Sequence, residues 1–231
     1  MVEHVAKFGQ LRSQQLWEML FWELRSQTSL DRVLLRLVAS NHLARVARPV
    51  GGDGGGSAQY FYHLGREGRR LVGRDPRGYY APTPGSQHTA HRLAIVDRYV
   101  QVLQAARAGS FELLGFRPEP RLNVGTNRLT PDALMVLGFG ERGSGEEVDY
   151  WLEVDRGTED ADDIEDKCVR YWRAYQQWQR DDVFPFIFFV VPDEQRARFI
   201  RGVIAGGPDE ARDLFEVATF GDFIPALNKV L

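Results

Sequence analysis

Residues 131–158 read PDALMVLGFGERGSGEEVDYWLEVDRGT, and this stretch decides the fold of the chain. Two apolar runs, Ala133–Phe139 and Val148–Val154, flank a glycine-rich turn, which is the pattern of a β-hairpin. If the chain reverses at that turn, the numbers of paired residues sum to about 285. We therefore expect Asp132 to lie opposite or beside Glu153.

Three carboxylates and one lysine are predicted to gather at the end of this hairpin. Glu153 and Asp155 are two residues apart, so they share one face of their strand, and pairing brings Asp132 beside them. Lys167 falls in the helix that follows and can point back at the same strand ends. Carboxylates hold Mg²⁺ or Mn²⁺, and a nearby cation stabilises the charge that develops on a phosphate under attack. The sequence thus predicts metal ligands at Asp132, Glu153 and Asp155, with Lys167 as a further catalytic residue.

An alternative network of the same side chains needs no metal. Arg156 can pair with Glu153 or a neighbouring aspartate, and Lys167 can pair with Asp155. The carboxylates would then be structural members of an ion-pair cluster at the edge of the core. The residues alone leave the catalytic and the structural interpretation open.

The segments around the hairpin alternate between helix and strand. The predicted core consists of a helix, a strand, the two hairpin strands, a helix and a buried strand, with bounds Ala90–Ala108, Phe111–Phe116, Ala133–Phe139, Val148–Val154, Asp162–Gln179 and Phe184–Val191. A helix, a strand and a last helix follow at Glu194–Ala205, Leu214–Thr219 and Phe223–Val230. This αβββαβ order predicts a domain over residues 89–231, after a linker over 74–88 that is rich in proline and glycine.

The N-terminal part predicts a second, smaller domain over residues 1–73. Leu11, Leu16, Met19 and Leu20 recur at helical spacing, and a polar turn follows. Thr28 or Ser29 is the expected N-cap of a second helix, whose buried stripe consists of Leu30, Val33, Leu34, Leu37 and Val38. Two strands flank the glycine-rich segment that follows, and a short helix closes the domain. Helix, turn, helix and a two-stranded wing is the order of a winged helix-turn-helix, so the fold class is α+β with two domains.

In such a domain the second helix of the motif enters the major groove of DNA. Arg32 and Arg36 lie one turn apart on that helix and can reach bases or phosphates. The other candidate DNA contacts lie at its N-terminus and along the wing: Gln27, Thr28, Ser29, Arg45 and Arg48. The alternatives are that these arginines only solvate an exposed face, or that the domain binds protein.

Charge is divided unevenly along the 231 residues. Residues 1–80 hold 12 Lys and Arg against 7 Asp and Glu, whereas the remainder holds 17 against 25. The basic front half suits nucleic acid and the acidic remainder suits another partner. Cys168 is the one cysteine, which excludes an internal disulfide, and no apolar run has the ~20 residues of a membrane span. We expect a cytoplasmic protein without a membrane partner.

Asp132 after Pro131, followed by Glu153 and a basic residue further on, resembles the PD-(D/E)xK nuclease superfamily. Asp155 departs from that pattern, because it stands at the position normally held by lysine, and Lys167 corresponds to a lysine that has moved to the helix. His91 or Asp97 corresponds to the helical polar residue of the superfamily. More narrowly, the chain resembles the replication-relaxation family in its winged helix and in four short motifs: Ala90–Leu93, Pro131–Ala133, Glu153–Thr158, and Lys167 with Tyr171.

The resemblance implies a protein of a plasmid or mobile element that binds double-stranded DNA. It would act as a regulator or accessory factor in replication or mobilisation, together with the proteins of those processes, and its nuclease-like domain would be degenerate. A Mg²⁺- or Mn²⁺-dependent endonuclease or nickase is the first alternative, and a protein-interaction scaffold is the second. A homodimer is expected because winged-helix proteins often read paired half-sites.

Overall fold

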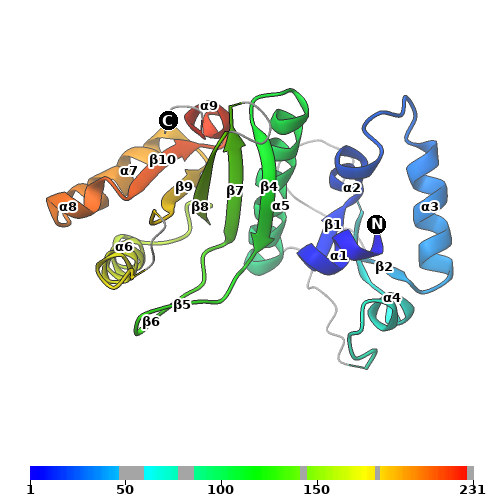
Figure 1. Ribbon diagram of the computed structural model, residues 1–231. Coiled ribbons are helices and arrows are strands. Elements are labelled where there is room, and N and C mark those ends of the chain that lie inside the picture. The colour runs from blue at the N-terminus through cyan, green and yellow to red at the C-terminus, as the bar shows by residue number, and fades with distance from the viewer. Residues whose placement is uncertain (47–59, 78–85, 141–144, 180–182, 228–231) are drawn as a thin grey trace. The chain divides into compact units, whose positions relative to one another are not determined.

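The computed structural model describes residues 1–46, 60–77, 86–140, 145–179 and 183–227 (Figure 1). The chain divides into two compact units, unit 1 over Met1–Val100 and unit 2 over Gln101–Leu231. Both contain helices and strands, which confirms the α+β class. Within the described residues, no helix combines the length and apolar character that a membrane crossing requires.

Unit 1 is built on a three-stranded antiparallel sheet in the order β1-β3-β2. Its elements are α1 (Val2–Phe8), β1 (Gln10–Arg12), α2 (Ser13–Leu20), α3 (Thr28–Ala39), β2 (Leu43–Val46), β3 (Phe61–Leu64), α4 (Arg66–Leu71) and the first part of α5 (Gln87–Arg107). Leu30 and Leu34 of α3 are buried one turn apart, so the apolar stripe predicted for this helix is confirmed.

The chain leaves α3 through a tight contact that requires glycine. Asn41 adopts a positive φ of 56°, a conformation in which asparagine commonly follows a helix. The Asn41 carbonyl then lies against Gly65, where an added Cβ would come within 2.3 Å of its oxygen. Any side chain at position 65 would therefore push β3 and α4 away from the end of α3.

The start of unit 1 differs from its prediction. Leu11 was expected in the first helix, but it lies in β1, a strand that pairs with β3 through Leu11 and Tyr62. Three residues are too few to show the alternation of a strand. Leu11 also fits the spacing of the following helix, so it was assigned to that helix. The helix α2 begins only at Ser13, and α1 precedes the strand.

The first part of α5 is held inside unit 1 by polar contacts. Arg12 pairs with Asp97 at 3.1 Å, and the Gln15 amide donates to the Asp97 carboxylate at 2.6 Å and to the Leu93 carbonyl at 3.1 Å. The second domain was predicted to begin at residue 89, whereas unit 2 begins at Gln101. The difference is the first part of α5, which belongs to unit 1.

Unit 2 contains a five-stranded sheet in the order β10-β9-β8-β7-β4, and Figure 1 labels its strands. Its elements after α5 are β4 (Glu112–Pro118), β5 (Leu122–Val124), β6 (Asn127–Leu129), β7 (Ala133–Phe139), β8 (Glu146–Val154), α6 (Ala161–Gln176), β9 (Phe186–Val191), α7 (Glu194–Ala205), α8 (Asp209–Arg212), β10 (Phe215–Thr219) and α9 (Phe223–Leu227). The strands β4, β7 and β8 are antiparallel, whereas β8, β9 and β10 are parallel. The elements predicted for this part are present, and the small hairpin β5–β6 and the short helix α8 are additional.

The register of the central hairpin matches its prediction. Ala133 pairs with Leu152 and Met135 with Tyr150, so the residue numbers of each pair sum to 285. The Asp132 amide donates to the Leu152 carbonyl at 2.9 Å and continues the ladder by one step. Asp132 is thereby placed beside Glu153.

Alternation along β8 and β9 sends side chains into two apolar layers. Trp151, Ile187 and Phe189 face α6 and α7, where they contact a cluster that includes Tyr171 and Ile200. On the opposite face, Tyr150 and Phe188 are fully buried, and Phe188 meets Phe223 of α9 with ring centroids 5.6 Å apart. Glu153 follows Trp151 on the α6 and α7 side, and so enters a largely apolar layer.

Candidate functional site

The carboxylate cluster lies where β8 ends, on the sheet face covered by α6 and α7. We use this name for four acids and two bases: Asp132, Glu153, Asp155, Glu159, Lys167 and Arg196. Glu153 and Asp155 are each only 4% exposed, although both are acids. Burial of a carboxylate is costly unless charged or hydrogen-bonding groups face it, so the partners of these two side chains define the site.

Glu153 is held by two side chains of α6. Lys167 donates from Nζ to Glu153 Oε2 at 2.8 Å, and the Tyr171 hydroxyl donates to Oε1. Burial raises the pKa of Glu153 to about 7; Lys167 acts against this shift, and the negative charge of Asp132 adds to it. Glu153 is therefore poised to exchange a proton near neutral pH.

Lys167 bridges two acids, because Nζ also lies 2.8 Å from Glu159 Oε1. Burial alone would lower the pKa of Lys167, but Glu153 and Glu159 outweigh that effect and leave it above its ordinary value. Burial and the neighbouring Glu153 also raise the pKa of Tyr171. Lys167 stays a cation and Tyr171 stays a neutral hydrogen-bond donor, so neither is suited to act as a base.

Asp155 is held from the other helix. Arg196 of α7 donates from Nε to its Oδ2, and the Gly157 amide donates to Oδ1 at 2.9 Å. Arg196 also donates from Nη2 to the Glu159 carbonyl at 2.7 Å. Gly157 has a φ of 79°, the left-handed region that glycine adopts at no steric cost, and so allows the turn that closes on Asp155.

Asp132 completes the cluster from β7. Its Oδ2 accepts a hydrogen bond from the Val154 amide at 2.7 Å, which ties the two hairpin strands together at the level of the acids. Its negative charge contributes to the raised pKa of Glu153.

The four residues predicted as catalytic are thus brought together, but their pairing differs from both sequence interpretations. Lys167 pairs with Glu153 rather than Asp155, because the helix α6 places it over the strand and not past its end. Arg156, expected beside Glu153, has an exposed side chain, and Arg196 neutralises Asp155.

The fit to a divalent metal is poor in this arrangement. The oxygens of Glu153 face Lys167 and Tyr171, and those of Asp155 face Arg196 and Gly157. Across the described part of the chain, no three acidic, histidine or cysteine side chains are grouped so that they could hold one ion. Binding of Mg²⁺ or Mn²⁺ to Asp132, Glu153 and Asp155 stays a prediction and would require these ion pairs to open.

The second candidate site is the outer face of α3 in unit 1. Arg32 and Arg36 are both exposed one turn apart, and Gln27, Thr28 and Ser29 are exposed at the N-terminal end. Helix α3 starts at Thr28 after Gln27, which makes no side-chain capping bond, so neither Thr28 nor Ser29 is the N-cap that was expected.

The strand side of this surface is formed by aromatic and basic residues. Arg45 of β2 lies over the Tyr60 ring, with its guanidinium carbon 4.3 Å from the ring centroid. When a guanidinium stacks on an aromatic face, the N–H groups at its own edge can still donate hydrogen bonds to an anion. Arg48 lies outside the described residues.

The model of the replication-relaxation family matches residues 2–187 of the chain. The chain belongs to the replication-relaxation family. Comparisons with curated proteins and with solved structures gave no significant match. The matched segment of this replication-relaxation protein includes α3, Tyr171 and every member of the carboxylate cluster except Arg196, because it ends before α7.

Sequence reasoning missed two members of the cluster in this replication-relaxation protein. Arg196 is 41 positions from Asp155, and only the parallel pairing of β8 with β9 brings α7 back over the strand. Glu159 precedes α6 in an acidic segment, and acids near a helix N-terminus are common because the helix dipole favours them. Its spacing of eight residues from Lys167 would have been the available indication, because Glu159 lies just before α6 and Lys167 lies in the second turn of that helix.

The helical polar residues named from the nuclease resemblance have a different setting. Asp97 is engaged by Arg12 and Gln15 within unit 1, and His91 lies earlier on the same helix. The carboxylate of Asp97 therefore serves the packing of α5 on α2 and β1.

Proposed function

We propose that unit 1 is a winged helix that binds double-stranded DNA through α3. The replication-relaxation protein would then act as a regulator or accessory factor in the replication or mobilisation of a plasmid or mobile element. The observation that carries the proposal is the exposed pair Arg32 and Arg36 on the third helix of an α-β-α-α-β-β arrangement. Family membership supports the biological setting.

The chemistry of α3 suits a phosphate backbone and the major groove. Leu30 and Leu34 bury the inner face against the unit, so the arginines are held on the outer face by a fixed helix. The exposed hydroxyls of Thr28 and Ser29 lie at the helix N-terminus, where backbone N–H groups attract an anion. Arg45 adds a positive charge from β2.

Unit 2 fits a nuclease-like domain whose carboxylates have become structural. Lys167 and Arg196 neutralise Glu153 and Asp155 directly, which is the function that a divalent cation would otherwise serve. In this proposal the cluster fixes α6 and α7 on the sheet and does not cut DNA.

Binding is tested with a short mixed-sequence duplex at salt concentrations between about 50 and 200 mM. Arg32→Ala combined with Arg36→Ala should weaken binding by about tenfold or more and should flatten its salt dependence. Arg170→Ala combined with Arg198→Ala removes two exposed arginines from unit 2 and is the matched control, which should bind as the unmodified chain does. Equal loss in both pairs, or no salt-dependent binding at all, would favour the protein-interaction scaffold.

A metal-dependent endonuclease is the second candidate, because Asp132, Glu153 and Lys167 do converge. Supercoiled plasmid is incubated with the protein in Mg²⁺ or Mn²⁺, beside Glu153→Gln and Lys167→Ala. Nicking by the unmodified chain that both substitutions abolish would establish the enzyme and refute the structural role of the cluster. Intact plasmid with a retarded band for all three proteins supports the proposal. A homodimer remains a prediction for sedimentation or light scattering to test.

A further inference from the structure

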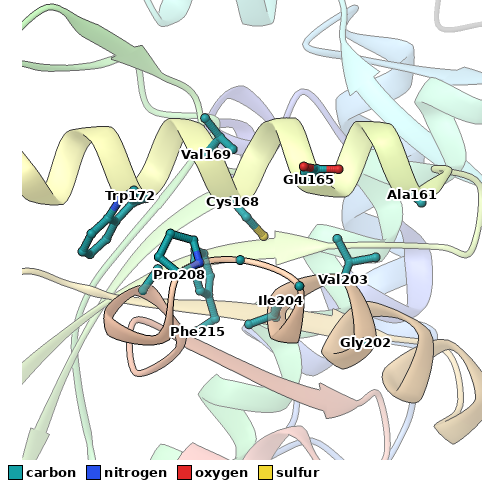
Figure 2. A pocket seen from close by; sticks show the side chains of 13 residues that line it. Ala161, Glu165, Cys168, Val169, Trp172, Gly202, Val203, Ile204, Pro208 and Phe215 are labelled. Carbon is teal, nitrogen blue, oxygen red and sulfur yellow. The ribbon is translucent and has the colours of Figure 1, made fainter.

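A cavity of about 420 Å³ lies in unit 2 between α6 on one side and α7, α8 and the start of β10 on the other (Figure 2). Its volume is within the range of small-molecule sites in proteins. The walls are mainly apolar, with Cys168 and Trp172 from α6 and Ile204 and Pro208 from the opposite side. Figure 2 shows the Cys168 sulfur directed across the space toward Ile204.

The charge at this cavity is negative and comes from one residue. Among the described residues that line it, Glu165 is the only charged side chain. It is exposed, so its carboxylate lies at the mouth and can meet the charged end of a bound molecule without desolvation of a buried acid. The lining therefore combines an apolar interior with a negative rim.

We infer that this cavity binds a small organic cation, with an apolar or aromatic body inside and an ammonium group at Glu165. Neither the carboxylate cluster nor the α3 surface contributes to it, so the inference goes beyond the proposed function. The apolar walls exclude a nucleotide or an inorganic anion, because their phosphate charge would find no basic partner among the described lining residues.

The spacing of the lining residues fixes the size of the molecule. Glu165 and Trp172 both line the cavity from α6, and seven residues of helix separate them by ~11 Å. Trp172 is stacked on Tyr175 with ring centroids 5.5 Å apart, which holds the indole in place at the far end. A ligand with a ring near Trp172 and an ammonium group near Glu165 needs a linker of several carbon atoms.

Steric crowding does not require glycine at position 202, so this residue is consistent with a cavity that is kept open. It lies inside α7 and lines the cavity, and a Cβ built on it would meet no atom within 4 Å. Glycine weakens a helix interior relative to alanine, so this position gives up helix stability without a steric need. Gly202 is exposed and lines the cavity, so a larger residue there would narrow the cavity from the α7 side.

The test uses the full chain and two probes of equal length, 4-phenylbutylammonium and the neutral 4-phenylbutan-1-ol, in isothermal titration calorimetry. We expect the cation to bind at least tenfold more tightly than the alcohol. Glu165→Gln should remove this preference and leave alcohol binding unchanged. Asp166→Asn removes an exposed acid from the same turn of α6 outside the cavity, and it should keep the preference.

The second part of the test uses substitutions that fill the cavity. Gly202→Leu should abolish binding of both probes, and Gly202→Ala should weaken it while leaving the thermal unfolding temperature equal or higher. If Gly202→Leu fails to fold, the alanine variant alone decides. Absence of saturable binding by either probe, equal affinity for both, or unchanged affinity in the alanine variant would overturn the inference.

Discussion

The titration of Glu153 should make the protein less stable as pH rises from about 5 to 8. The pKa of Glu153 is about 7 in the fold and 4.5 in an unfolded chain, so the folded state binds a proton more strongly over this interval. Stability is then greatest below the unfolded pKa and is lost as the pH passes the folded pKa. Each unit of pKa difference corresponds to about 1.4 kcal/mol, so the shift of Glu153 sets an upper limit of about 3–4 kcal/mol for the whole loss.

The measurement is urea unfolding at a series of pH values for the unmodified chain and for Glu153→Gln. The amide keeps the size of the side chain but cannot ionise, so the difference between the two curves isolates Glu153. This comparison is needed because His4 and His63 have a lowered pKa through burial and give the opposite slope below neutral pH. A difference curve that is flat, or that rises with pH, would refute the assignment of a raised pKa to Glu153.

Three further results are expected. Arg196→Ala leaves Asp155 buried without its cation and should lower the free energy of unfolding in urea by about 3–5 kcal/mol. The control Arg198→Ala removes an exposed arginine and should change that free energy by less than about 0.5 kcal/mol. Similar decreases for both variants would mean that the buried ion pair adds no stability. Gly65→Ala should destabilise unit 1 by about 1–3 kcal/mol or more, because the added Cβ would lie 2.3 Å from the Asn41 carbonyl oxygen. An unchanged thermal unfolding temperature would contradict that contact. Burial raises the pKa of Cys168 to about 12, so the thiol should react with a disulfide reagent at least about 100-fold more slowly at pH 8 in the folded chain than in urea; equal rates would show an accessible thiolate.

The parts of the fold that follow from local pattern could be predicted from the sequence. The hairpin of β7 and β8 has two long runs and a glycine-rich turn, and that alone sets the register that brings Asp132 beside Glu153. The buried stripe of α3 and the bounds of α7 follow from helical spacing in the same way.

What could not be predicted depends on contacts between distant segments. The strand β1 has three residues and is stabilised by β3, about fifty positions away, so no local period marks it. Arg196 reaches Asp155 only because β9 adds in parallel to β8 and returns the chain over the same face. Side-chain spacing within one segment carries no information about such a crossover, and for that reason Lys167 was found and Arg196 was not.

The balance of charge in the carboxylate cluster connects its structural and catalytic interpretations. Four acids face two bases, so full ionisation leaves two negative charges without a partner inside the cluster. A proton on Glu153 removes one of them. Burial of this carboxylate raises its pKa, and the negative charge of Asp132 adds to the shift. A divalent cation would remove both, but it would have to displace that proton and compete with Lys167 and Arg196 for the same oxygens. Because the proton is lost above pH 7, metal binding at this site would be strongest at alkaline pH, where a plasmid-nicking assay gives the nuclease alternative its best opportunity.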